Sequence, residues 1–432
     1  MSENKRPKLS IGLPVYNGED FLEEAIESIL SQTYTDFELI ISDNASVDRT
    51  EEICLDYAAK DDRIRYIRQS ENLGAARNFN SVFELSSGEY FKWAAHDDVC
   101  KGNFLSRCIE ALDQEHSACL GYTRAITIDE KGKFKKKHSP SENFGSEITH
   151  LRFREALSDW GFPVPLFGVI RSNILSKTTL FTGYASCDRP LLAELSLYGR
   201  FYEVPEYLFL ERSHPDNGRR FYNDPDQSAI WWGVPLNKKT VYQHWKLLSG
   251  FVTAVNRVPL SWHERAHCYI EVSNWIKRHQ LYLFQEILKS IEVVPVLGKF
   301  INTSLIKFYL TSRLNPMYKV IKDIDSVIPI EDKYILVDQC SFRKEYFPGK
   351  RHIPFLEKDG QYWGLPGDDE TAIIELERIR LNGANFIAFT RPAFWWLDYY
   401  KKFSNYLRLN FQCLIENNRL VIFDLRIGKE SS

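Results

Sequence analysis

Long apolar runs are missing from this chain of 432 residues. No stretch approaches the roughly 18 consecutive apolar residues that a membrane-spanning helix needs. Residues 1–8 are polar and basic and lack the apolar segment of a secretory signal peptide. We therefore expect a cytoplasmic protein. Any membrane association would be peripheral, at the inner face of the plasma membrane, and the aromatic amphipathic segment 300–310 would allow it.

Signatures of several common binding sites are also absent. The eight cysteines are scattered and form no Cys-x-x-Cys, so neither a zinc site nor a disulfide framework is indicated. The net charge of −3 gives no reason to expect nucleic-acid binding. No Gly-x-Gly-x-x-Gly follows the first predicted strand, and no Gly-Lys-Ser/Thr loop occurs. Dinucleotide-binding and P-loop interpretations are therefore weak.

The first hundred residues show an alternating pattern. Short apolar runs, typical of strands, alternate there with segments of helical period. Strands are predicted at 9–16, 37–42, 64–67 and 90–95, and helices at 20–32, 48–60 and 75–85. Repeated β-α units predict an α/β fold with a mostly parallel sheet flanked by helices.

The remainder of the chain changes character twice. From about residue 227 the pattern becomes helical, with helices predicted at 245–255, 264–290 and 297–312. A small α/β unit follows, with strands at 334–337, 385–390 and 419–425 and helices at 368–381 and 395–407. We therefore predict three domains, at 1–226, 227–325 and 326–432.

Two adjacent carboxylates, Asp97 and Asp98, lie where the apolar run 90–95 ends. In an open α/β sheet, the carboxyl ends of strands are where ligands bind. Adjacent carboxylates repel each other unless they share a cation or a hydroxyl-rich ligand. The pair therefore indicates a divalent metal that holds a phosphorylated substrate. The alternative is a helix N-cap, because a helix-like stretch follows from Gly102.

Three more polar segments follow strands in this region: 14–17, 42–46 and 72–74. Parallel strands would bring them to the same edge of the sheet as the carboxylate pair. A bound nucleotide needs an aromatic or proline wall for the base, an acceptor for the base or ribose, and a metal for the diphosphate. Together with the carboxylate pair, which would hold the metal, these segments contain residue types that fit all three needs.

On these motifs the chain resembles the family 2 glycosyltransferases, which have the GT-A fold. The resemblance covers roughly residues 8–215 and is carried by segments in the family's order: 11–18, 32–46, 72–78, 88–90 and 97–98. It implies a nucleoside-diphosphate sugar donor and a glycan, lipid-linked or small acceptor, as in polysaccharide or cell-envelope synthesis.

The resemblance also implies a role for each matched position. Pro14 and Tyr16 would flank the base, which would be a uridine or similar. Asp43 would accept a hydrogen bond from this base. Asp97 would contact the ribose, and Asp98 would bind Mg²⁺ or Mn²⁺ bridging the diphosphate. Three further residues complete the implied site: Asn17 and Arg77 toward the donor, and His214 toward the metal.

The implied catalytic base is Asp188, in the segment 186–192. It would take a proton from the acceptor hydroxyl and so give inversion at the anomeric carbon. Because Pro190 suits a first helical turn, a helix-capping role is the alternative for Asp188. The family pattern is broken at two positions, where Ala95 and Cys187 replace carboxylates.

Other interpretations stay open. The broken positions favour a catalytically weak or inactive protein that binds nucleotide sugars or acts as a scaffold. A nucleotidyltransferase also uses paired carboxylates and a metal, but the acidic segment 16–20 argues against its basic loop. Arg212 or Arg219 could contact phosphate. Trp160 and the segment 167–168 could bind the acceptor sugar, and aromatic packing is the alternative for both. The lysine-rich segment 131–138 is either a solvated loop or a contact for an anionic glycan or membrane. The aromatic cluster 394–400 indicates core packing or glycan binding.

Overall fold

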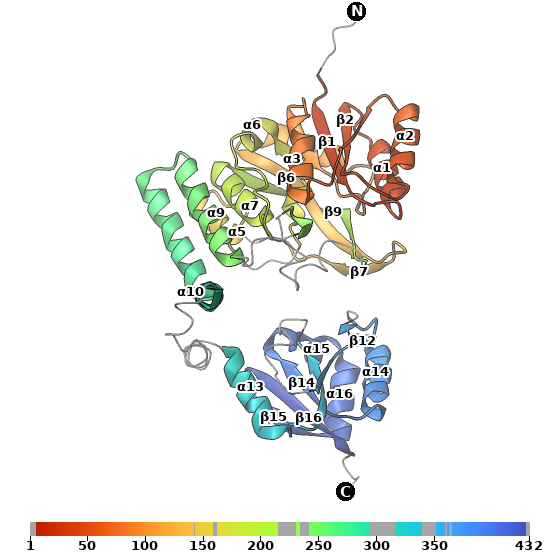
Figure 1. Cartoon of the computed structure of the whole chain (residues 1–432), viewed down its shortest axis with the longest axis vertical. Helices are drawn as coiled ribbons and strands as arrows, with labels where there is room; N and C mark the ends of the chain where they lie inside the picture. The colour runs from red at the N-terminus through yellow and green to blue at the C-terminus, as the bar shows by residue number, and fades with distance from the viewer. Residues whose placement is uncertain are drawn as a thin grey trace, which may run out of the picture. The chain divides into compact units, whose positions relative to one another are not determined.

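The computed structural model describes residues 6–141, 143–158, 162–214, 230–233, 242–293, 316–338, 351–358, 361–362 and 365–428. The chain forms two compact units, Met1–Pro295 and Val296–Ser432 (Figure 1). The predicted helix 297–312, the segment 300–310, Trp160 and Arg219 lie outside the described residues. No helix among the described residues is both long and apolar enough to cross a membrane.

The first unit contains a nine-stranded sheet whose main path runs β3-β2-β1-β4-β8-β6-β9-β5. Its first four strands are parallel and match the predicted strands: β1 (Leu9–Val15), β2 (Phe37–Asp43), β3 (Ile64–Arg68) and β4 (Tyr90–Trp93). The helices between them are α1 (Leu22–Leu30), α2 (Thr50–Lys60) and α3 (Ala75–Glu84). All seven residues of β1 are buried, because helices cover both faces of a doubly wound sheet. The predicted α/β class is therefore confirmed.

The second half of this sheet is mixed. The short strand β8 (Val169–Arg171) pairs antiparallel with β4 and with β6 (Ala118–Ile128). Next to it, β6 runs parallel to β9 (Arg200–Arg212) along most of its length. Two strands complete the sheet: β5 (Val99–Cys100) beside β9, and β7 (Phe134–Lys137) in a hairpin with β6. The helices here are α4 (Phe104–Gln114), α5 (Thr149–Ala156), α6 (Ser172–Leu175) and α7 (Asp188–Tyr198), with a 3-10 turn η1 (Val164–Phe167).

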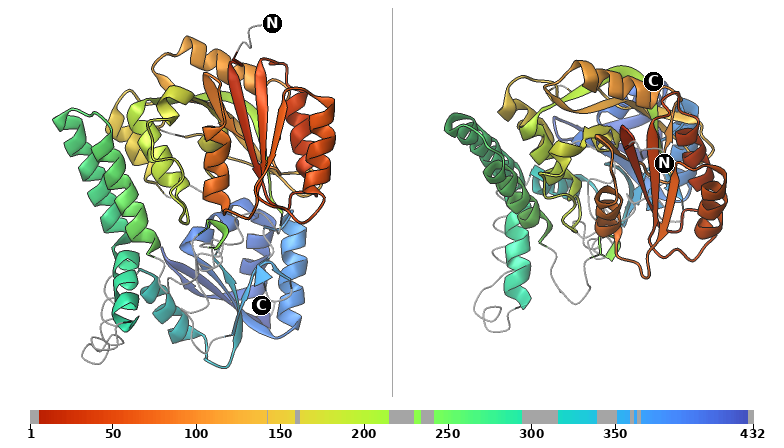
Figure 2. Two further views of the ribbon diagram at one scale, coloured as in Figure 1. Left: turned by 45° about the horizontal axis from the view of Figure 1, so that its top comes forward. Right: turned by 90° about the horizontal axis from the view of Figure 1, so that it is seen from above.

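Two long helices continue the first unit: α9 (Gln243–Arg257) and α10 (Trp262–Val293). They lie side by side at the edge of the unit (Figure 2). Within the unit α9 packs on α7, and α10 packs on α5. Their buried residues Phe251 and Trp275 join the same hydrophobic core as the sheet. This helical segment therefore contributes directly to the packing of the first unit.

The second unit has a five-stranded sheet in the order β11-β10-β14-β16-β15. Its strands are β10 (Lys333–Val337), β11 (Arg351–Pro354), β14 (Ala384–Thr390), β15 (Phe411–Glu416) and β16 (Leu420–Gly428). Its helices are α13 (Pro316–Val327), α14 (Asp369–Leu381), α15 (Trp395–Tyr399) and α16 (Lys401–Asn410), with a turn η4 (Arg391–Ala393) and a small ribbon of β12 (Glu357–Lys358) and β13 (Gln361–Tyr362).

The aromatic cluster 394–400 has both buried and exposed members. Trp396 and Tyr400 are buried in the core of the second unit, whereas Tyr399 is 70% exposed. The Tyr400 hydroxyl donates to the Pro366 carbonyl oxygen at 2.8 Å. Tyr400 also separates α15 from α16, so the single helix predicted at 395–407 is wrong.

Candidate functional site

The loops that follow β1 and β2 are hydrogen-bonded to each other. The Asn17 N–H donates to Ser46 Oγ at 2.9 Å, and Asn17 Oδ1 accepts from the Val47 N–H at 3.0 Å. Asn17 holds this position with a φ of 50°, in a region that Asn tolerates better than most residues. The Asn44 N–H also donates to the Val15 carbonyl. These bonds fix the backbone on which Asn17 lies.

The loop after β3 joins the same network. Asn44 Nδ2 donates to Asn72 Oδ1 at 2.9 Å, and the Leu73 N–H donates to Asn44 Oδ1 at 2.8 Å. The three polar segments 14–17, 42–46 and 72–74 therefore meet at the carboxyl edge of the parallel strands, as the predicted strand order implies.

Gly74 allows this edge to approach the segment 230–233. Its φ is +79°, and an added Cβ would lie 2.3 Å from the Gly233 Cα. We expect Gly74→Ala to lower the free energy of unfolding by about 3 kcal/mol, through backbone strain and overpacking. Gly132 is the matched control because its φ is +76° and no described atom lies within 4 Å of its Cβ position. Gly132→Ala should cost only about 1 kcal/mol. Denaturant unfolding of both variants would measure the difference, and equal losses would contradict this account of Gly74.

Asp43 ends β2 and is fully buried. Its Oδ1 accepts from the Ser46 N–H at 2.8 Å, and its Oδ2 accepts from the Tyr66 hydroxyl at 2.9 Å and from Arg68 at 3.3 Å. Both carboxylate oxygens therefore help to shape the loop 44–47. A carboxylate has about four acceptor positions, so these contacts leave room for one more donor.

The other predicted donor-site residues differ in exposure. Pro14 is buried within β1, whereas Tyr16 is 44% exposed just beyond the strand. Arg77 lies in the first turn of α3, is exposed, and forms no hydrogen bond or ion pair with any described residue. Tyr16 and Arg77 are thus the accessible members of this group.

Asp97 and Asp98 lie in the loop between β4 and β5. The next helix, α4, begins at Phe104 after Asn103, so the pair does not cap it. Asp97 Oδ2 is 2.9 Å from Nε2 of His214, which follows β9. The His214 ring packs on Phe21, with ring centroids 4.7 Å apart. Asp97 and His214, remote in sequence, are therefore brought together.

The two carboxylates of the pair have opposite electrostatic environments. Burial, together with the charge of Asp97, raises the pKa of Asp98 well above its usual value. One opposing contact is the Arg212 N–H, which donates to Asp98 Oδ1 at 2.8 Å. Burial also acts on Asp97, but the charge of His96 and the hydrogen bond from His214 hold the pKa of Asp97 below its usual value. A nearby cation would favour ionisation of both carboxylates.

Arg212 organises the pair from the end of β9. Its side chain is 1% exposed and lies over the Phe21 ring. The guanidinium donates to the carbonyl oxygens of Asp97 at 2.9 Å, Asp129 at 3.3 Å and Glu130 at 3.1 Å, and to the Glu24 carboxylate at 2.5 Å. Four of the five guanidinium N–H donors are therefore used within the protein, and a contact of Arg212 with phosphate stays a prediction. Sequence inspection could not find the structural role of Arg212, since no local pattern distinguishes a buried arginine from a surface one.

Asp188 is the first residue of α7, after Cys187 as N-cap and Ser186 at a φ of 63°. The carboxylate is buried, and Oδ1 has no hydrogen-bond partner among the described residues. Burial raises the pKa of Asp188, although the charge of Arg189 opposes the shift. No described hydrogen bond or ion pair links Asp188 to Asp97 or Asp98. A raised pKa is one property of a general base and reach to the substrate proton is the other, so the role of Asp188 as base stays a prediction.

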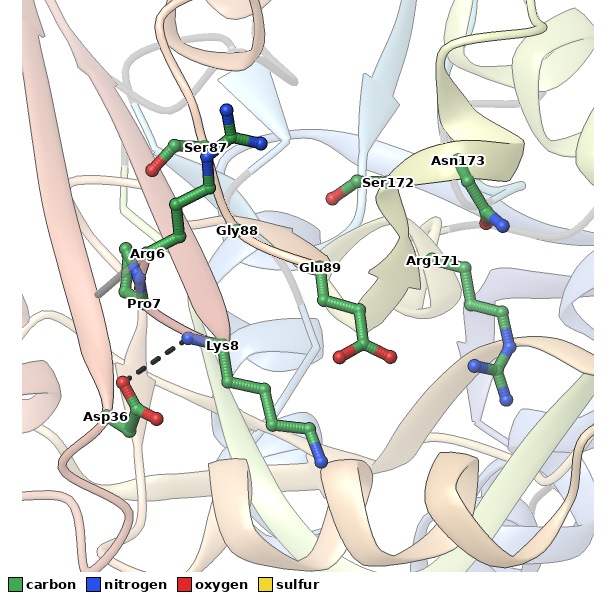
Figure 3. Close-up of a pocket in the computed structure, with 10 residues that line it drawn as sticks. All are labelled: Arg6, Pro7, Lys8, Asp36, Ser87, Gly88, Glu89, Arg171, Ser172 and Asn173. Atoms are coloured by element: carbon green, nitrogen blue, oxygen red, sulfur yellow. Dashed lines mark hydrogen bonds between the residues drawn. The ribbon is translucent and has the colours of Figure 1, made fainter. Parts of the chain in front are cut away.

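Two observations limit the position and type of site. A pocket of about 610 Å³ lies at the opposite, amino edge of the strands, lined by Lys8, Asp36 and Glu89 among others (Figure 3). These three residues directly precede β1, β2 and β4, so the pocket is separate from the carboxyl-edge loops.

Within the described ranges, no group of three or more His, Cys, Asp or Glu residues is arranged to hold a metal ion. A metal here would need ligands from a substrate or water.

Comparisons with known proteins agree with the motifs. The family described as Glycosyl transferase family 2 matches residues 10–177. The chain is similar to an uncharacterised glycosyltransferase of Rickettsia typhi, with 34% identity over 72% of this chain and 97% of that protein. It is also similar to the glycosyltransferase GlyG of Streptococcus pneumoniae, with 28% identity over 48% of this chain and 71% of that protein.

Among solved structures, S. aureus TarS 1–349 in complex with UDP aligns at a TM-score of 0.49 and 16% identity, over 73% of this chain and 90% of that one. The family assignment does not depend on this structure. It rests on the R. typhi relative, which this chain matches along almost its whole length, and on the family match itself. The chain is therefore a glycosyltransferase and belongs to glycosyltransferase family 2.

Proposed function

We propose that this enzyme transfers a sugar from a nucleoside-diphosphate sugar to a hydroxyl of a glycan, lipid-linked or small acceptor, with inversion at the anomeric carbon. The observation that carries the proposal is the Asp97–Asp98 pair, held at the carboxyl edge of the parallel strands by His214 and Arg212. Polysaccharide or cell-envelope synthesis at the cytoplasmic side of the membrane would suit such an acceptor.

The division into domains at 1–226, 227–325 and 326–432 stays a prediction.

The donor would lie across the loops after β1, β2 and β4. Tyr16, supported by the buried Pro14, would form one side of the base-binding site. Asp43 would accept a hydrogen bond from the base at its remaining lone-pair position. Asn17 would contact the nucleotide through the loop that it shares with Ser46. Asp97 would accept from the ribose, and the exposed Arg77 would neutralise phosphate charge.

A divalent cation fits the chemistry of the pair. Mg²⁺ sites in nucleotide-dependent enzymes often use only one or two carboxylates, with substrate phosphates completing the coordination. Asp98 would hold Mg²⁺ or Mn²⁺, which would stabilise charge on the leaving diphosphate when bound. His214 stays a predicted metal ligand, and its Nε2 would have to leave Asp97 to bind.

Asp188 would act as the base. One carboxylate oxygen would accept the proton of the acceptor hydroxyl while the hydroxyl oxygen forms a bond to the anomeric carbon. The bond from that carbon to the diphosphate oxygen breaks on the opposite face, and the nucleoside diphosphate leaves with the electron pair. One displacement of this kind inverts the configuration.

The test is turnover of a panel of UDP-, GDP- and dTDP-sugars by the purified protein, with and without EDTA. We expect release of nucleoside diphosphate from one donor, loss on chelation and recovery with Mn²⁺. Turnover that is unaffected by EDTA would refute the metal role. Retention of configuration in the product would refute the single displacement.

A nucleotide-sugar-binding protein without transferase activity is the second candidate. Cys187 favours it because burial raises the pKa of this thiol to about 12, so Cys187 does not replace the carboxylate charge of the family pattern. Calorimetry that shows donor binding, together with no turnover across the panel, would support this alternative.

A further inference from the structure

A basic hairpin leads away from the candidate site. It is formed by β6 and β7, which pair from Ile126 with Lys137 to Ile128 with Phe134. Figure 1 shows that it extends beyond the body of the first sheet. Residues 129–138 contain five lysines and two carboxylates, in a chain whose net charge is −3. The hairpin is therefore a local concentration of positive charge.

All residues from 130 to 137 are exposed. Among them Phe134 is 58% exposed, although an aromatic ring of this size is normally buried. Asp129 stabilises the turn, because its Oδ1 accepts from the N–H groups of Lys131 at 3.0 Å and Lys133 at 2.8 Å. One of the two acidic side chains is thus used within the turn, while the side chains of Lys131, Lys133 and Lys135 extend into solvent.

We propose that this hairpin docks the enzyme on an anionic membrane surface, with its lysines at the lipid headgroups and Phe134 in the interfacial layer. Basic clusters are attracted to anionic lipids, and apolar side chains beside such clusters enter the boundary between headgroups and acyl chains. A soluble acidic polymer would attract the lysines but would give no role to an exposed Phe134. The combination therefore favours a lipid surface.

The hairpin is connected to the candidate site through Arg212. The guanidinium binds the carbonyl oxygens of Asp129 and Glu130 at the start of the hairpin turn, and also that of Asp97. The Arg212 N–H binds the Asp98 carboxylate. Docking of the hairpin would hold this site next to the lipid surface. Among the three acceptor classes this selects the lipid-linked one, a conclusion that rests on the proposed function.

Vesicle sedimentation of the full-length protein tests the docking. The protein should bind vesicles of phosphatidylcholine with added phosphatidylglycerol, should not bind phosphatidylcholine alone, and should be released by salt. The triple variant Lys131→Gln/Lys133→Gln/Lys135→Gln lacks three positive charges of the hairpin and should partition to these vesicles on the order of 100-fold more weakly. The control variant lacks three positive charges on exposed lysines elsewhere and should still bind the vesicles; it is Lys101→Gln/Lys277→Gln/Lys401→Gln.

The result can also overturn the proposal. Failure of the wild type to bind phosphatidylglycerol vesicles would do so, as would equal binding by the two triple variants. Heparin binding that Phe134→Ser leaves unchanged, together with no vesicle binding, would assign the hairpin to an acidic polymer instead. Thermal shifts with nucleotide sugars, measured on the same samples, separate this proposal from the proposed function. Donor binding without vesicle binding refutes only the docking, and vesicle binding without donor binding refutes only the donor site.

Discussion

Replacing Asp188 by asparagine is expected to lower kcat by about 10²–10⁴-fold, the usual contribution of a general base. The side chain keeps its size, so donor binding measured by calorimetry should change little. The control is Asp113→Asn at the amino edge of the sheet, where Asp113 binds Lys8 and Tyr90. That variant should keep its kcat. Unchanged transfer by Asp188→Asn would remove Asp188 as the base.

The pH dependence gives an independent check of the same residue. Because burial raises the pKa of Asp188, kcat should fall as the pH falls through this raised value and the base becomes protonated.

The stability of the folded protein should depend on pH in the opposite direction, and fall as the pH rises. The buried charge destabilises the folded protein only once the pH rises above the ordinary carboxyl range toward the raised pKa. Asp188→Asn should therefore melt higher than wild type at neutral pH, with a difference that disappears in acid. A lower melting temperature at neutral pH would indicate a structural role instead.

The sequence predicted the elements that carry the candidate site because their signals are local. The strands β1 to β4 are short apolar runs, and each predicted boundary lies within two residues of the observed one. The Asp97–Asp98 pair was identifiable because a change from apolar to acidic residues marks the end of β4. Parallel pairing places the carboxyl ends of such strands at one edge of the sheet, so the position of the site can be predicted even when no side-chain contact is known.

The contacts that organise the site could not be predicted, because they join residues that are distant in sequence. Asn44 and Asn72 lie in separate loops, and only the folded sheet brings their amides within hydrogen-bonding distance. The Arg212 side chain donates to the Asp97 carbonyl oxygen, although the two residues are 115 positions apart in the sequence. The insertion of β8 between β4 and β6 likewise follows from tertiary packing, since a three-residue strand has no periodicity to recognise.

Replacing Asp98 by asparagine is expected to reduce transfer roughly 10³-fold, since loss of metal-assisted charge stabilisation costs several kcal/mol of transition-state binding. Unlike Asp188→Asn, this variant should also bind the donor less tightly. The Arg212 N–H could still donate to the amide oxygen, so the loop should keep its conformation. Steady-state kinetics with the donor found in the panel would measure both effects.

A second measurement does not depend on turnover. Mn²⁺ with UDP should raise the melting temperature of the wild type but not that of Asp98→Asn, because ligands that bind the folded state stabilise it. Asp61→Asn is the control, since Asp61 binds Arg63 just before β3 and lies at the amino side of the sheet. That variant should keep the metal-dependent shift. An equal shift in Asp98→Asn and wild type would show that the cation is held elsewhere, and the carboxylate pair would then contact only the nucleotide sugar.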